Sequence, residues 1–313
     1  DAVLKSSPTA EENPFYERCL LETARLLFDT GEIEKSMERF EKLANETKNK
    51  EFKEEAIVRG GLLAAEAGKP ELSEKFLDQA MRFSDTSPWK ALALVGSIFN
   101  AFAREDYDKV IGIYNTGAYD TPEDSRAKVN LIVGHSFRMK NQLESALRLY
   151  TLVETKFPKT KEGSEAGYRK LQILHQQGAS SLGTAAREFI DQQRIANPDS
   201  NYIDLAYLMK AEWHFSKAEG AASGADSKFA TENFKSSAEA YAAVRSEKVD
   251  EKFHEISLYK MGWAQIESGA LEEGIKTLSR FLVSHPKSDL ASSAMAKRAT
   301  THQSLNNQTL ALE

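Results

Sequence analysis

The sequence predicts an all-α protein, a right-handed solenoid of about seven helix-turn-helix units closed by a C-terminal capping helix. Three observations support this fold class. The 313 residues include only 8 prolines, about half the usual frequency, so long stretches are free to form helix. A pattern of apolar helix, turn and second helix recurs along most of the chain. Small residues and turn residues recur at matching places within these segments.

The repeats follow one another along the chain. Four consecutive segments have the same order of elements, beginning at Cys19, Ala56, Ala91 and Val129, and three further copies begin near Ala166, Ala206 and Ser257. The polar residues 1–13 are expected to form a flexible N-terminal segment ahead of a superhelix over 14–310. The expected units span 17–50, 54–87, 88–120, 123–160, 162–200, 201–248 and 251–287, followed by the terminal helix at 289–310.

One position in each first helix is expected to lie closest to the second helix of its pair. Aligning the repeats places it at Ala24, Gly61, Ile98, Gly134, Leu171, Ala211 and Gly262. Three of these residues are glycine and two are alanine, as a close backbone approach between antiparallel helices requires. The spacing is 36 to 37 residues over the first five positions and lengthens toward the end of the chain.

A turn is expected seven residues after each close-contact position. Residues that adopt left-handed backbone geometry and end helices occupy this place at Gly31, Gly68, Asn141, Gly178 and Gly269. Glu105 in the third unit is the exception. The long spacing between Ala211 and Gly262 predicts an insertion, and residues 220–227 have the composition of a flexible loop. This loop is either a tolerated surface insertion or a contact for a partner.

The chain resembles the tetratricopeptide repeat family, whose unit is a helix-turn-helix with small contact residues and a proline after the second helix. Pro158, Pro198 and Pro286 stand at the proline position. The segments FPKT, NPDS and HPKS around them look most like bacterial envelope members, such as outer-membrane assembly lipoproteins and periplasmic cell-division coordinators. The resemblance implies a protein-binding scaffold in a bacterial cell-envelope complex. The alternative is a cytoplasmic adaptor or co-chaperone with the same fold.

The resemblance also implies a concave groove lined by the first helices. The groove candidates are Phe99, Phe102, His135, Arg138, Tyr168, Gln172, Phe215, Tyr259 and Trp263. His175, Leu208 and Glu212 occupy equivalent positions. The wall is largely apolar and lacks the basic set that clamps a C-terminal carboxylate, so an amphipathic helix or an extended hydrophobic segment is the expected ligand. The alternative is a tightly wound superhelix that buries this wall against itself.

Tyr259 and Trp263 are four residues apart and are expected to stack on the concave side.

Catalytic, cofactor and nucleic-acid functions are disfavoured by the same sequence. The six histidines do not occur at metal-ligand spacing, and no phosphate-binding glycine loop or nucleophile elbow is present. A net charge of -6 offers no basic surface for a phosphate backbone. We therefore expect no enzyme activity, no cofactor and no nucleic-acid partner.

No run of 18 apolar residues occurs, so no transmembrane segment is expected. The chain begins with Asp1 instead of Met, so we expect that a preceding segment was either processed away or cut off. A signal peptide or a membrane anchor is the expected content of that segment, and with it a periplasmic or envelope location. The sequence leaves the partner's identity and the oligomeric state open.

Overall fold

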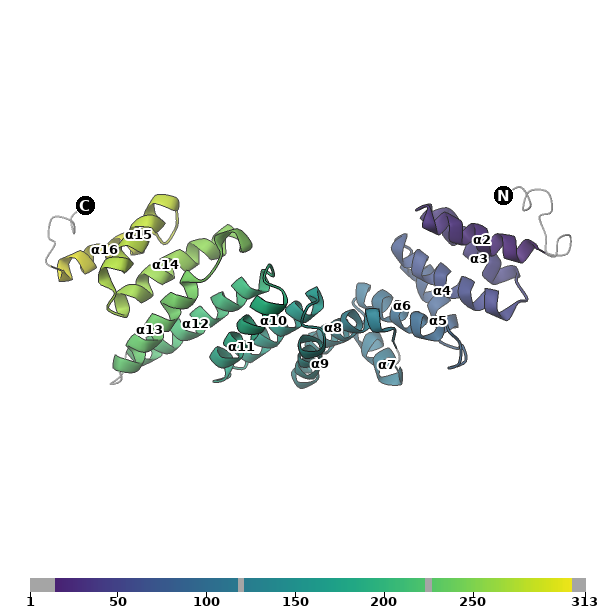
Figure 1. Cartoon of the computed structure of the whole chain (residues 1–313), viewed down its shortest axis with the longest axis horizontal. Helices are drawn as coiled ribbons and strands as arrows, with labels where there is room; N and C mark the ends of the chain where they lie inside the picture. The colour runs from purple at the N-terminus through teal and green to yellow at the C-terminus, as the bar shows by residue number, and fades with distance from the viewer. Residues whose placement is uncertain (1–14, 118–120, 223–226, 306–313) are drawn as a thin grey trace. The chain divides into compact units, whose positions relative to one another are not determined.

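The computed structural model describes residues 15–117, 121–222 and 227–305. Within these ranges the chain forms fifteen α-helices and one short 3-10 helix, without strands (Figure 1). The helices follow one another as seven pairs and a final helix, which confirms the predicted α-solenoid fold class. The expected flexible segment 1–13 lies outside the described residues.

The chain divides into two units, Asp1–Leu149 and Tyr150–Glu313, with the division inside α9. The helices up to this division are α2 Tyr16–Asp29, α3 Ile33–Glu46, α4 Lys50–Glu66, α5 Pro70–Ala80, α6 Lys90–Ala103, α7 Tyr107–Gly117, α8 Glu123–Met139 and α9 Leu143–Lys156. In this unit the first helices α2, α4, α6 and α8 contact one another in order. They therefore form a continuous wall.

The second unit holds α10 Lys161–Gln176, α11 Leu182–Ala196, α12 Tyr202–Ala222, α13 Ser227–Ala242, η2 Ser246–Lys248, α14 Glu251–Glu267, α15 Leu271–Ser284 and α16 Ala291–Ser304. Here α10 contacts α12, and α14 contacts α16. Helix α13 contacts both α12 and α14. The final helix α16 packs on α14 and α15 as a further first helix would, and residues 306–310 of the predicted terminal helix lie outside the described residues.

The two helices of a pair meet closely at the predicted small residues. The Ser36 hydroxyl on α3 donates a hydrogen bond to the Ala24 carbonyl on α2 at 2.7 Å, and the Ser237 hydroxyl donates to the Ala211 carbonyl at 2.9 Å. A Cβ atom added at Gly262 would lie 2.8 Å from Leu278 on α15. Larger side chains at these positions would push the paired helices apart.

The predicted turn residues adopt left-handed backbone conformations. Gly31, Gly68, Gly178, Gly269 and Asn141 all have positive φ. Glu105 is not an exception, because its φ of 59° places it in the same region. The α6–α7 turn thus keeps the shared geometry with a residue that has a Cβ atom, at a steric cost.

The insertion in the sixth unit lengthens a helical hairpin. The prediction of a loop at 220–227 is wrong for its first residues, because α12 continues through Ala222. Residues 223–226 lie outside the described part of the chain. The two helices of this hairpin pack on each other, and Phe215 meets Phe234 edge-on at a centroid distance of 5.5 Å. His214 Nδ1 and Asn233 Oδ1 lie 2.8 Å apart in a hydrogen bond.

Replacing Glu105 with glycine is expected to raise the free energy of unfolding by about 0.5 to 1 kcal/mol, because glycine adopts positive φ without the steric penalty of a Cβ atom. The measurement is urea unfolding followed by far-ultraviolet circular dichroism. Asn141→Gly is the matched control, and its effect should be smaller because asparagine tolerates this conformation. A lower unfolding midpoint for Glu105→Gly would contradict the strain assigned to this turn.

Candidate functional site

The groove candidates of the first unit link neighbouring first helices. The Phe102 ring on α6 stacks on His135 of α8, with centroids 6.2 Å apart and planes at 29°. Lys128 on α8 places its Nζ atom 4.5 Å from the centroid of the Phe99 ring. These three candidates and Arg138 are half-buried, and the Arg138 Nε atom is buried without a hydrogen-bond partner among the described residues.

The candidates of α10 are half-buried and interact locally. The Tyr168 ring lies 5.5 Å from the ring of Tyr202 on α12, and Gln172 accepts a hydrogen bond from Arg169 at 3.1 Å. Burial raises the pKa of the Tyr168 hydroxyl. Tyr168 therefore remains a neutral phenol on the wall between α10 and α12.

Two candidates of the later units belong to the core. Phe215 is 6% exposed and Tyr259 is 8% exposed, so only a small part of each ring is accessible to a partner. Phe215 packs within the α12–α13 hairpin, and Tyr259 packs on Phe281 of α15 at 5.7 Å. The repeat alignment placed both on first helices, but it carried no information about how deeply their rings are covered.

Trp263 lies beside Tyr259 with its ring edge-on, at 5.7 Å between centroids and 70° between planes. The predicted stacking of these two rings is therefore wrong in geometry, although the contact exists. Lys297 of α16 places its Nζ atom 4.8 Å from the centroid of the Trp263 ring. Trp263 is half-buried between α14 and α16, so it contributes to the packing of neighbouring first helices.

Ion pairs reinforce the same contacts between first helices. Arg25 on α2 pairs with Glu55 on α4 at 2.5 Å, and Lys260 on α14 pairs with Glu212 on α12 at 2.5 Å. Arg25 and Glu212 both directly follow a close-contact residue, Ala24 and Ala211. The surface formed by the first helices, which we call the inner wall, is therefore partly covered by its own side chains in each unit.

An open cleft remains in the inner wall of the second unit. Its volume is about 320 Å³. We call it the inner-wall cleft, and its lining residues come from α10, α12 and α14: Tyr168, His175, Leu205, Leu208, Met209, Glu212, Phe253, Ile256 and Ser257. Four of these, Tyr168, His175, Leu208 and Glu212, stand at groove positions inferred from the family resemblance.

The lining is mainly apolar, and its acidic group is neutralised. Glu212 accepts a hydrogen bond from the Tyr241 hydroxyl at 2.6 Å and pairs with Lys260. Burial, together with the negative charge of Glu212, raises the pKa of Tyr241, so the phenol keeps its proton and donates to the carboxylate. Leu205, Leu208, Met209 and Ile256 supply the apolar wall, and Phe253 is 48% exposed.

Sequence reasoning missed part of the lining, namely Leu205, Met209, Phe253, Ile256 and Ser257. They lie on first helices but outside the three groove positions carried over from the family. The insertion in the sixth unit was the sequence signal that could have pointed to this cleft, because α12 of that unit lines it. An alignment of regular repeats does not show how the helices of an irregular unit pack on those of the neighbouring units.

The described residues were also searched for a metal centre and a membrane span. They contain no group of three or more histidine, cysteine, aspartate or glutamate side chains placed to hold a metal ion. None of the described helices has both the length and the apolar character needed to cross a membrane.

Trp263→Ala is expected to lower the free energy of unfolding by about 2 kcal/mol, because it removes a half-buried ring from the α14–α16 contact. Phe253→Ala on the same helix is the matched control, and its effect should stay below about 1 kcal/mol because the side chain is largely exposed. Urea unfolding of both variants provides the comparison. Equal stability of the two variants would indicate that Trp263 does not hold first helices together.

Two of three comparisons with known proteins find a match, namely the family profiles and the solved structures. The profile of the Tetratricopeptide repeat family matches residues 257–288, which include most of α14 and all of α15. The C-terminal part of a TPR repeat-containing protein from Cytophaga hutchinsonii superposes with a TM-score of 0.60 at 14% identity, covering 88% of this chain and 98% of that one. A tetratricopeptide repeat protein from Parabacteroides merdae gives a TM-score of 0.48 at 12% identity, covering 82% and 89%.

The search of curated proteins gives no match. The family profile and the Cytophaga structure agree with the paired helices of this chain. The chain therefore has the tetratricopeptide repeat fold, assembled from seven helix pairs and a final helix.

Proposed function

We propose that the protein is a non-catalytic scaffold that binds a partner protein through the inner wall of its second unit. In this proposal an apolar side chain of the partner enters the inner-wall cleft. The observation that carries the proposal is the cleft itself, which exposes leucine, methionine, isoleucine and phenylalanine side chains from the first helices α12 and α14. Such a surface gains free energy when apolar groups cover it.

The size of the cleft favours a short anchor. Its volume of about 320 Å³ is near the lower end of the range of about 300 to 1,000 Å³ for ligand pockets. A leucine, methionine or phenylalanine side chain from an amphipathic helix or extended segment suits this space, and its burial contributes about 1.5 to 3 kcal/mol. The paired Glu212 carboxylate leaves no uncompensated charge against such a group.

The proposed location is a bacterial cell envelope, and it rests on the three proline segments that resemble envelope members. These segments form one repeated turn, in which the backbone N–H of Thr160, Ser200 and Ser288 donates to the carbonyl three residues earlier at 3.0 to 3.1 Å. The repeated geometry supports treating them as a single motif. Recovery of the full-length protein in the cytosolic fraction of its native host would contradict this location.

The binding proposal is tested by site-specific photo-crosslinking in cells of the native host. His175 lines the inner-wall cleft and is exposed, so benzoylphenylalanine in its place should crosslink a discrete partner protein. Phe253→Glu should then reduce the crosslinked product at least about tenfold, because a carboxylate at the rim opposes entry of an apolar group. The exposure of Phe253 allows this variant to fold.

Two controls make the result specific. Benzoylphenylalanine in place of Val283, which is 83% exposed on second helix α15, should not give the same product. Phe229→Glu on α13 matches Phe253→Glu in residue type and exposure, and it should leave the His175 product unchanged. Persistence of that product in Phe253→Glu would refute binding through the cleft.

A further inference from the structure

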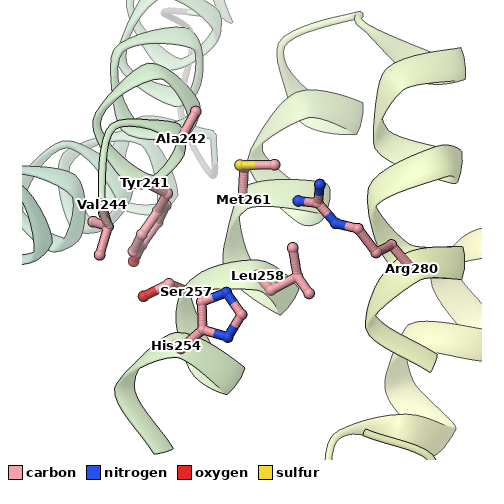
Figure 2. A pocket seen from close by; sticks show the side chains of 8 residues that line it. All are labelled: Tyr241, Ala242, Val244, His254, Ser257, Leu258, Met261 and Arg280. Atoms are coloured by element: carbon pink, nitrogen blue, oxygen red, sulfur yellow. The ribbon is translucent and has the colours of Figure 1, made fainter. Parts of the chain in front are cut away.

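A second cleft lies on another side of α14, between α13 and α15. Its volume is about 230 Å³. We call it the outer cleft, and it is lined by Tyr241, Ala242, Val244, His254, Ser257, Leu258, Met261 and Arg280 (Figure 2). Ser257 lines both clefts, so α14 forms a wall common to the two.

Two basic side chains of the outer cleft have unused hydrogen-bonding capacity. Arg280 is exposed and extends from α15 toward α14, and His254 stands on the first turn of α14 (Figure 2). Neither side chain forms a hydrogen bond or an ion pair with the described residues. His254 contacts the ring of His285 edge-on, at 6.1 Å between centroids. A guanidinium and an imidazole are therefore available to a ligand.

The other polar groups of the outer cleft are already engaged. The Tyr241 hydroxyl donates to Glu212, and the Ser257 hydroxyl donates to the Phe253 carbonyl at 2.6 Å. Burial and the positive charges of His285 and Arg280 lower the pKa of His254, with Glu251 acting weakly in the opposite direction. The neutral imidazole still offers one N–H donor. The open donors of the cleft thus favour an acceptor that carries negative charge.

We propose that the outer cleft binds a carboxylate of an acidic peptide segment, with Arg280 and His254 as its donors. A guanidinium matches the two oxygens of a carboxylate in a forked geometry. Leu258, Met261 and Val244 provide an apolar surface for the aliphatic carbons next to the carboxylate. This inference rests on the proposed function in one respect, because it takes the ligand to be part of a protein partner.

The test follows the Arg280 and His254 side-chain signals by nuclear magnetic resonance in the full chain, at constant ionic strength. The probes are blocked amino acids: N-acetylglutamic acid α-amide has only a side-chain carboxylate, N-acetylleucine has only a terminal carboxylate, and N-acetylglutamine α-amide has neither. Saturable shifts with a carboxylate probe and none with the glutamine probe are expected. The probe that binds more tightly identifies the source of the carboxylate.

Arg280→Gln should weaken carboxylate binding about tenfold, because it removes the charged donor. Lys276→Gln, one turn earlier on α15 and outside the outer-cleft lining, should leave binding unchanged. Equal shifts with the neutral probe, or unchanged binding in Arg280→Gln, would overturn the proposal. The Arg280 and His254 signals report on the outer cleft, whereas the His175 crosslink reports on the inner-wall cleft, so failure of one test is distinct from failure of the other.

Discussion

The close approach of the two helices in each pair is the constraint on which the rest of the structure depends. Its clearest form is in the seventh pair, where Gly262 on α14 faces Gly274 on α15. A Cβ atom added at Gly274 would lie 2.9 Å from the Gly262 carbonyl oxygen. With no side chain between the backbones, the pair has one preferred register, because any larger group would separate the helices and expose their apolar faces.

This register also determines what the inner wall carries. The residue directly after the close-contact position turns away from the second helix by about 100°. Phe99, His135, Glu212 and Trp263 all stand there, and each contacts a neighbouring first helix. The same side chains that suggested a binding groove therefore fix the stacking of the first helices. Free apolar surface remains at the inner-wall cleft, which is lined by α10, α12 and α14 of the second unit.

The helix pairs and most turns could be predicted from the sequence because each of them depends on the geometry within a single repeat. Small contact residues and left-handed turns leave a signal in a single repeat, which is why the helix pairs and most turns were predicted. Glu105 was missed because the contacts of its pair impose its conformation against its own preference. The depth of burial of Phe215 and Tyr259 depends on side-chain packing within each helix pair, and the two clefts depend on contacts between repeats. The periodicity of the sequence encodes neither.

The most direct measurement of the central constraint compares leucine substitutions at three helical glycines. Gly61 and Gly262 are close-contact residues, whereas a Cβ atom added at Gly112 on α7 would meet nothing within 4 Å. In urea unfolding, Gly61→Leu and Gly262→Leu should each lose about 1 to 3 kcal/mol of stability or more. Gly112→Leu should be neutral or slightly stabilising, because leucine favours helix over glycine. Parent-like unfolding of Gly61→Leu and Gly262→Leu would contradict the account.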